Sequence, residues 1–142
     1  MSLREFCQRK VISLSPESNI VEACRLMATN NIGCLVVQEK GKMCGILTDR
    51  DIALKVTGQN RDPQKTKARE IMSRSPVRIP VENNLQQLTN LMRVHHVRRV
   101  PIVDNVDEVL GIVTMDDLIA QISHEMSDLG DAVIESLPVG TA

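Results

Sequence analysis

A threonine and an aspartate recur at one spacing in two places, and this repeated pair is the strongest chemical signal in the chain. Thr48 and Asp51 lie in the peptide GILTDRDI, and Thr114 and Asp117 lie in the peptide GIVTMDDL. An aspartate presents two acceptor oxygens, which suit the paired 2′ and 3′ hydroxyls of a ribose. A threonine at a helix start can cap the helix, and the unpaired backbone N–H groups there attract phosphate. Thr-x-x-Asp is also an ordinary capping pattern, so it is the recurrence at equivalent places that favours two ligand sites.

The two peptides belong to an internal repeat that spans most of the chain. Four identities recur 65 residues apart, since Glu17, Asn19, Leu26 and Met27 return as Glu82, Asn84, Leu91 and Met92. The apolar register agrees, aligning Ile12 with Val77, Leu14 with Ile79, Ile20 with Leu85, Ala23 with Leu88, Ile32 with Val97 and Leu35 with Val100. The Thr-x-x-Asp pairs are 66 residues apart. The second copy therefore needs one extra residue, which we expect in the polar turn 104–108.

Each copy is expected to fold as strand, helix, strand, strand, helix. The first helix of each copy has an N-cap and a capping-box partner at the expected spacing, Asn19 with Glu22 and Asn84 with Gln87. The apolar pattern of the first copy predicts strands at 11–14, 32–37 and 43–47, a turn at Lys40-Gly41 and a second helix from Thr48 to about Val56. The second copy repeats this order from Val77 to Ile122.

These elements predict a division into two repeats, at 7–57 and 72–123, with a linker at 58–71 and a tail at 124–142. The linker is polar and contains Gly58 and Pro63, and it ends in a helical turn near 68–72. The tail is expected to continue the last helix and to fray at Pro138-Val139-Gly140, with apolar positions at Met126, Leu129 and Val133. A helix that covers the core is the favoured interpretation, and a partner-binding helix is the alternative.

Composition excludes several classes of function. Lys and Arg number 17 against 18 Asp and Glu, so no bulk charge attracts nucleic acid or an anionic membrane. We find no apolar run long enough to span a membrane and no signal peptide, and we expect a soluble, cytoplasmic protein. Phe6 is the only aromatic residue, so a bound base must lie between aliphatic side chains. Cys24, Cys34 and Cys44 lie in apolar patterns and are expected to be buried and reduced, and the Cys and His spacing gives no support for a metal site.

The organisation resembles a pair of CBS domains, the tandem called a Bateman module. The resemblance covers about residues 7–122 and is carried by Asn19–Ala23 and Asn84–Leu88, by the strand Arg99-Val100-Pro101-Ile102-Val103-Asp104, and by both Gly-x-x-Thr-x-x-Asp peptides. The first copy departs from it, with Cys34-Leu35-Val36-Val37 in place of the arginine strand. The resemblance implies an α+β fold in which two β-α-β-β-α repeats pack sheet against sheet with pseudo-two-fold symmetry and leave two clefts.

The resemblance also implies roles for individual residues. Asp51 and Asp117 would hold ribose, and Thr48 and Thr114 would take the adjacent hydroxyl or a phosphate. The remaining expected ligand-binding residues are candidate adenine walls (Ile12 with Ser13, and Ile79 with Pro80), phosphate-facing arginines (Arg50, Arg98, Arg99) and Pro101 on the arginine strand.

The two clefts are expected to differ in charge. Gly33 and Cys34 stand where the second copy has Arg98 and Arg99, and Asp116 stands where the first copy has Arg50. We expect the Asp51 cleft to take the tighter or more phosphorylated ligand. The alternative for the arginine pair is a solvated surface pair. His95 and His96 are expected to end a helix, with a phosphate contact as the alternative.

The favoured function is a regulatory module that binds an adenosine nucleotide (AMP, ADP or ATP, with NAD or S-adenosylmethionine as alternatives) and signals through a homodimer or an effector protein. No catalytic residues are assigned, because the chain has neither a Walker loop nor a Gly-x-Gly-x-x-Gly motif. The rival hypotheses are a structural dimerisation module with non-functional clefts and a nucleotide-hydrolysing enzyme.

Overall fold

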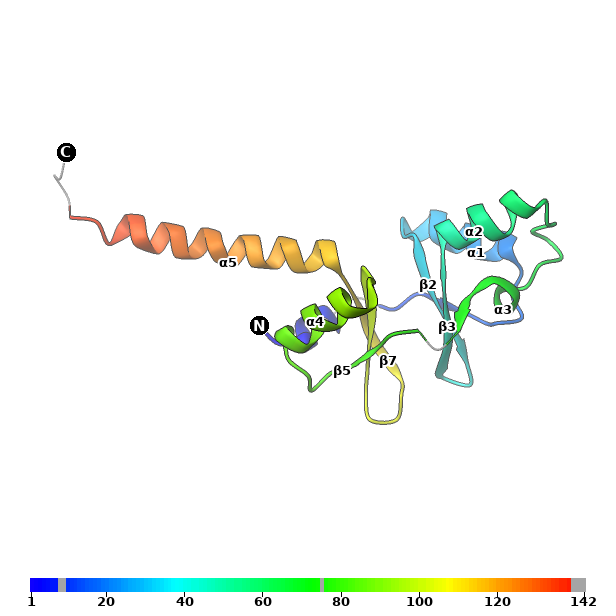
Figure 1. Cartoon of the computed structure of the whole chain (residues 1–142), viewed down its shortest axis with the longest axis horizontal. Coiled ribbons are helices and arrows are strands. Elements are labelled where there is room, and N and C mark those ends of the chain that lie inside the picture. The colour runs from blue at the N-terminus through cyan, green and yellow to red at the C-terminus, as the bar shows by residue number, and fades with distance from the viewer. Residues whose placement is uncertain (8–9, 75, 139–142) are drawn as a thin grey trace.

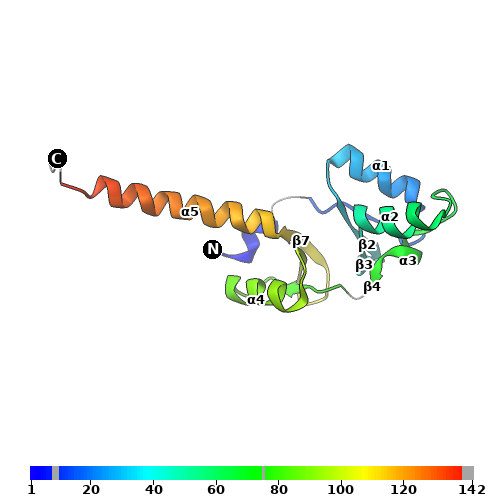
Figure 2. The same ribbon diagram turned by 45° about the horizontal axis from the view of Figure 1, so that its top comes forward.

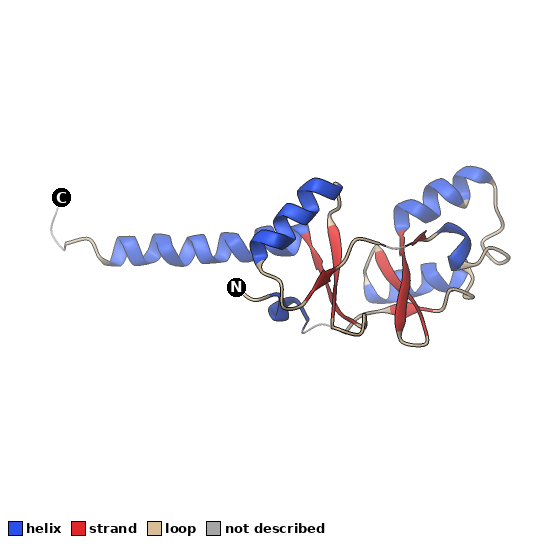
Figure 3. Ribbon diagram, turned by 60° about the horizontal axis from the view of Figure 1, so that its bottom comes forward, coloured by secondary structure: helices blue, strands red, loops and turns tan. Residues whose placement is uncertain are grey.

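The computed structural model describes residues 1–7, 10–74 and 76–138, and it forms two lobes that each contain a β-sheet (Figure 1). The first lobe has a four-stranded sheet in the order β1-β2-β3-β4. The second lobe has a three-stranded sheet in the order β5-β6-β7. Figure 3 separates strands from helices and shows that each sheet has its own helices. The fold is α+β, as predicted.

The first lobe contains the first copy of the repeat. Its strands are β1 (Ser13–Leu14), β2 (Cys34–Glu39), β3 (Lys42–Thr48) and β4 (Ser73–Arg74), and its helices are α1 (Ile20–Asn30), α2 (Asp49–Lys55), the 3₁₀ turn η2 (Thr57–Gln59) and α3 (Ala68–Ile71). β1 runs parallel to β2, and β2 and β3 form an antiparallel hairpin. Lys40 and Gly41, with φ of 53° and 78°, make the predicted turn.

The second lobe repeats this arrangement. It contains the 3₁₀ helix η1 (Leu3–Cys7), β5 (Ile79–Pro80), α4 (Leu85–His95), β6 (Arg99–Val103), β7 (Val109–Thr114) and α5 (Met115–Glu135). β5 is parallel to β6, and β6 is antiparallel to β7. The predicted extra residue lies in the turn between β6 and β7, where the Asp104 carboxylate accepts hydrogen bonds from the backbone N–H groups of Val106 and Glu108 at 2.9 Å.

Each lobe is completed by the segment that precedes the other repeat. Leu3 of η1 is 1% exposed in the core of the second lobe, and η1 contacts β7, so the N-terminal segment is part of the second lobe (Figure 1). Conversely, Ala68 and Ile71 of α3 are buried in the core of the first lobe, and β4 pairs with β3. The lobes meet through an apolar cluster of Cys34, Val36, Met43 and Ile46 with Val11, Val109 and Ile112. This cluster joins the two sheets face to face.

The glycines of the repeated peptides make room for these crossing segments. A Cβ at Gly111 would lie 2.7 Å from the Phe6 carbonyl oxygen, and a Cβ at Gly45 would lie 2.9 Å from the Ser73 carbonyl oxygen. Both distances are shorter than packed atoms tolerate. The glycine of each motif is therefore required by packing between chain segments.

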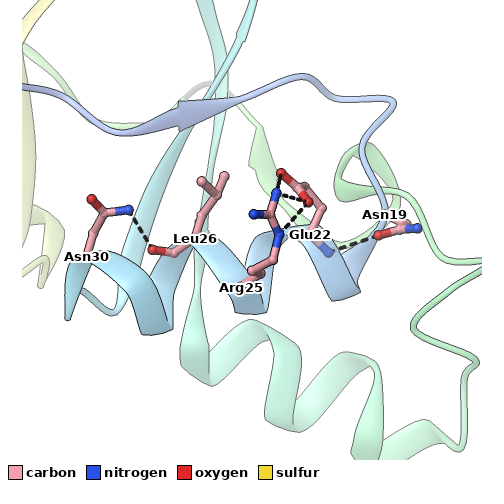
Figure 4. Close-up of polar contacts among 5 residues, drawn as sticks. All are labelled: Asn19, Glu22, Arg25, Leu26 and Asn30. Atoms are coloured by element: carbon pink, nitrogen blue, oxygen red, sulfur yellow. Dashed lines mark hydrogen bonds and ion pairs between the residues drawn. The ribbon is translucent and has the colours of Figure 1, made fainter.

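The predicted caps are present, with one exception. The Asn19 side chain accepts a hydrogen bond from the Glu22 N–H, and the Asn84 side chain accepts one from the Gln87 N–H. Gln87 completes its capping box. Glu22 does not, because its carboxylate pairs with Arg25 (Figure 4), so this half of the prediction is wrong. α4 ends at His95, and the C-cap residue His96 is in the left-handed region (φ 54°), which confirms that this pair ends the helix.

The tail is the largest departure from the predicted fold. α5 runs without a break to Glu135 and projects away from both lobes (Figures 1 and 2). Every residue from Ile122 to Pro138 is exposed. The expectation of a helix that covers the core is therefore wrong. The helix ends before Pro138, and Val139 and Gly140 lie outside the described residues.

The cysteines differ in burial. Cys34 is buried, but Cys44 is half-buried and Cys24 is exposed, so the expectation for Cys24 is wrong. The buried face of α1 is the narrow stripe of Ile20, Ala23 and Met27, and Cys24 lies beside it.

In the part of the chain that the structure describes, no helix is long and apolar enough to cross a membrane.

Candidate functional site

A cavity of about 280 Å³ lies where the two lobes meet, and Asp117 is on its wall. Its aliphatic walls come from Val11, Ile12, Ile32 and Ile112. The remaining lining residues are Phe6, Lys10, Gly33, Cys34, Arg99 and Thr114. We call this space the Asp117 cavity. It combines aliphatic walls with one carboxylate and two cations, which is the composition of a site for a small polar ligand with a flat apolar part.

The first turn of α5 fixes the position of the carboxylate. Thr114 is the N-cap, and its hydroxyl accepts a hydrogen bond from the Asp117 N–H at 3.0 Å. In return, the Thr114 N–H donates to Oδ2 of Asp117 at 3.3 Å. Among the described residues, no group donates to the other oxygen, Oδ1. One acceptor of a fixed carboxylate is therefore available to a ligand.

Cys34 contributes an inert wall to the same cavity. Its side chain is buried, and burial raises the pKa of its thiol to about 11, although Arg99 opposes this shift. The thiolate is the reactive form of cysteine. At neutral pH Cys34 is therefore a protonated, weakly polar surface.

A second cavity, of about 340 Å³, lies beside Thr48. Its walls are formed by Ile46, Ser73, Pro76, Val77, Val97, Arg98 and Arg99. We call it the Thr48 cavity. Arg99 lines both cavities, whereas Arg98 lines only this one and lies 3.4 Å from the Asp116 carboxylate. Both arginines therefore line the Thr48 cavity, and Arg99 also lines the Asp117 cavity.

Asp51 is held differently from Asp117. Its Oδ2 accepts a hydrogen bond from the Thr48 N–H at 3.0 Å, and its Oδ1 lies 3.1 Å from the Lys55 ammonium. Lys55 is itself anchored, because its Nζ donates to the Ile71 carbonyl oxygen at 3.0 Å. Asp51 is not on the wall of the Thr48 cavity. Both of its oxygens are therefore already engaged within the first lobe.

Gln121 explains why Asp117 is not held in the same way. It occupies the position in α5 that corresponds to Lys55, four residues after the motif aspartate. Its amide contacts Glu125, at 3.5 Å, one turn further along the helix. The two repeated aspartates thus share a backbone setting but differ in the side chain one turn away.

The other predicted site residues lie outside both cavities. Arg50 is an exposed residue of α2, and Ser13 and Pro80 are exposed strand residues. Pro101 is buried within β6 opposite Ile112. Ile79 is 0% exposed in the core of the second lobe and lines neither cavity.

The residue that lines the Thr48 cavity in place of Ile79 is Val77. The repeat register aligns Val77 with Ile12, so this signal was present in the sequence. Lys10 was also missed, and no pattern in the sequence singles it out. It reaches the Asp117 cavity because the N-terminal segment crosses between the lobes.

The described lining of the Asp117 cavity contains one carboxylate, so paired-carboxylate catalysis is not offered there. Over the described residues, no group of three His, Cys, Asp or Glu side chains is arranged to hold a metal ion.

Comparison with known proteins agrees with this architecture. The family model of the CBS domain matches the chain twice, over residues 3–58 and 68–124. The CBS domain-containing protein YhcV of Bacillus subtilis is 41% identical over 125 residues, which cover 87% of this chain and 88% of that protein.

Solved structures give the same result. The CBS domain pair of protein MJ0100, in complex with 5-methylthioadenosine and S-adenosyl-L-methionine, superposes with a TM-score of 0.78 at 27% identity, covering 88% of this chain and 98% of that one. The CBS domain protein PAE2072 from Pyrobaculum aerophilum, complexed with AMP, superposes with a TM-score of 0.75 at 25% identity, covering 83% and 90%. The two matches of the family model and the paired lobes show that this chain belongs to the CBS domain family, as a tandem pair.

Proposed function

We propose that the chain is a regulatory module, without catalytic activity, that binds one adenosine nucleotide in the Asp117 cavity. The observation that carries this proposal is the available Oδ1 of Asp117 on the wall of a cavity between the lobes. AMP, ADP and ATP are the leading ligands, and NAD and S-adenosylmethionine are the alternatives. The AMP complex of PAE2072 and the S-adenosyl-L-methionine complex of MJ0100 support this ligand class.

The lining residues match the parts of an adenosine nucleotide. The base would lie between the aliphatic side chains of Val11, Ile12 and Ile112, since the cavity has little aromatic surface. Asp117 would accept hydrogen bonds from the ribose hydroxyls. Lys10 and Arg99 would compensate the charge of the phosphates.

Calorimetric titration with each of the five ligands tests this assignment. Asp117→Ala removes charged hydrogen bonds to the ribose, each of about 1.5–3 kcal/mol, so affinity should fall about ten- to over a hundredfold. Asp128→Ala is the matched control, because Asp128 is an exposed carboxylate of the same helix. Heat release that is identical in wild type and Asp117→Ala would refute the ribose contact.

We further propose that Lys55 makes the Asp51 cleft the weaker site, which reverses the order expected from the charges of the two motifs. A ribose at Asp51 would have to displace the ammonium that holds Oδ1. The ion pair is partly exposed and is worth only about 0.5 kcal/mol by itself. Its anchor on the Ile71 carbonyl keeps it in place, and no corresponding lysine restrains Asp117.

Exchanging the two side chains tests this asymmetry. Lys55→Gln gives the first copy the residue that the second copy has at this position. The affinity of the weaker site, at Asp51, should then increase by about a few-fold. Gln121→Lys makes the reciprocal change and should weaken binding at Asp117 by a similar factor. If neither variant changes affinity or stoichiometry, Lys55 does not control access to Asp51.

The regulatory output would pass through a homodimer or an effector protein, and a ligand can act only if it binds two packing states with different affinity. The structural alternative, a dimerisation module with non-functional clefts, predicts that none of the five ligands shifts the melting temperature. A ligand at about 100 times its dissociation constant should add roughly 2.7 kcal/mol to the free energy of unfolding. The two hypotheses are therefore separated by one thermal-shift series.

A further inference from the structure

The outer part of α5 carries a solvent-exposed apolar stripe. Ile119, Ile122, Met126, Leu129 and Val133 are between 41% and 63% exposed. The side-chain hydrogen bonds and ion pairs described beyond Ile122 stay within the helix and its end, as between His124 and Asp128. Figures 1 and 2 show the outer part of the helix standing clear of both lobes, whereas its first turn packs on the second lobe.

The stripe has the spacing of a coiled-coil seam. Ile119, Met126 and Val133 occur every seven residues, and Ile122 and Leu129 lie between them in the alternating three- and four-residue steps of a and d positions. β-Branched residues at a with Leu at d favour two-stranded pairing. Ile119, Val133 and Leu129 fit this preference.

Residues beside the seam permit close approach of an identical helix. The flanking positions e and g hold Ser123, Gly130 and Ala132, which are small and uncharged, and one acid, Glu125. In a parallel pair, g contacts the e position of the next heptad, so Glu125 would face Gly130 of the second copy. The other acids beyond Ile122, which are Asp128, Asp131 and Glu135, occupy positions c and f on the opposite face. Like charges therefore do not meet across the seam.

The helix also needs a partner for physical reasons. Residues 123–135 contribute no buried side chain. A segment of this length is marginally helical in water, and its Ser, Asp, Gly, Val and Ile residues have low helix propensity. Burial of the stripe against another surface would supply the missing stabilisation.

We propose that α5 pairs with α5 of a second copy of this chain as a short, parallel two-stranded coiled coil along this seam. The inference rests on the homodimer named under the proposed function but not on nucleotide binding. The seam has fewer than three heptads, so pairing should be weak and reversible, with a dissociation constant on the order of tens of micromolar.

Sedimentation equilibrium over a range of protein concentrations tests the pairing. Wild type should associate to a dimer, and Leu129→Glu should raise the dissociation constant at least about tenfold, because it places two charges in the seam. His124→Glu adds the same charge at position f and should remain dimeric. The mean helicity of wild type should rise with concentration, while that of Leu129→Glu should not.

Cross-linking tests the parallel register. Val133→Cys, in a Cys24→Ser background that removes the exposed native thiol, should form an interchain disulfide under mild oxidation. Ser127→Cys, on the outer face, should not. Equal cross-linking of the two variants would overturn the register.

The outcomes separate this inference from the dimer proposal. A wild-type chain that stays monomeric at about 100 μM overturns both. A dimer that survives Leu129→Glu overturns the coiled coil alone, because the dimer then uses another face. Loss of nucleotide binding has no bearing on either result.

Discussion

Asp51 and Asp117 show how one sequence motif gives two different sites. Both cap the N–H of their own N-cap threonine, so the capping function is common to the two copies. They differ in the residue four positions later, where Lys55 engages Asp51 and Gln121 leaves Asp117 with an available oxygen among the described contacts. The state of a motif residue is thus decided by a neighbour outside the motif.

Arg99 is the residue expected to distinguish phosphorylated ligands from adenosine. It lines both cavities, and a charged hydrogen bond to phosphate contributes about 1.5–3 kcal/mol. Arg99→Ala should therefore weaken ATP binding about ten- to a hundredfold while adenosine binding changes little. The control is Arg93→Ala, an exposed arginine of α4 outside both cavities. Equal losses for both ligands would mean that Arg99 does not meet a phosphate.

Cys34 should make stability depend on pH in the alkaline range. Its thiol pKa is raised from 9.0 to about 11, so the folded state holds its proton more tightly than the unfolded chain. The contribution is present below pH 9 and is lost as the pH rises through 11. Two pKa units correspond to about 2–3 kcal/mol. Denaturant unfolding should show the stability of wild type falling by this amount relative to Cys34→Ala between about pH 8 and pH 11. A constant difference would show that the thiol is not desolvated.

At the scale of the elements, the motif glycines allow the strands β3 and β7 to pack closely against the segments that cross between the lobes. Gly111→Ala would force a Cβ against the Phe6 carbonyl and the Cys7 backbone, which cannot move as freely as a side-chain tip. We expect a loss of about 1–3 kcal/mol in the free energy of unfolding. Gly130→Ala is the control, because a Cβ there meets nothing within 4 Å and should raise helicity. Equal stability of the two variants would contradict the close packing at Gly111.

Elements governed by local chemistry could be predicted from the sequence. The caps at Asn19 and Asn84, the Lys40-Gly41 turn and the longer turn at 104–108 depend on residues close together in the chain. The sequence also predicted correctly that the repeats form one α+β pair.

Features governed by distant contacts could not be predicted in the same way. Lys10 reaches the Asp117 cavity, and η1 enters the second lobe, only because the chain crosses between lobes. The Glu22 carboxylate could accept a hydrogen bond from the Asn19 N–H or pair with Arg25. Both partners are three residues away, so spacing alone did not predict the pairing with Arg25. Val77 is a different case. The repeat register aligns it with Ile12, so the sequence did contain the signal that Val77 lines the Thr48 cavity.

At the scale of the whole molecule, each lobe needs a segment from outside its own repeat to complete its core, whereas the tail adds nothing to either core. Each lobe core contains residues from the segment that precedes the other repeat. The tail beyond Ile122 adds no buried residue to either core. The lobe pair is therefore one packing unit, and the projecting helix is a separate surface attached to it.

Deletion of residues 123–142 should accordingly leave the lobe pair intact. At low micromolar concentration, where dimers are sparse, the free energy of unfolding should change by less than about 0.5 kcal/mol, as for other surface changes. Nucleotide affinity should be unchanged, and association should be lost. A large drop in stability of the truncated monomer would show that the tail packs on the lobes in solution.

The most direct test of the binding proposal compares the two repeated aspartates. Wild type, Asp51→Ala and Asp117→Ala should be titrated calorimetrically with whichever of AMP, ADP, ATP, NAD and S-adenosylmethionine binds wild type most tightly. Our account predicts one strong site per chain, at least about tenfold weaker binding in Asp117→Ala, and less than about threefold change in Asp51→Ala. Binding lost equally in both variants, or lost only in Asp51→Ala, would contradict it.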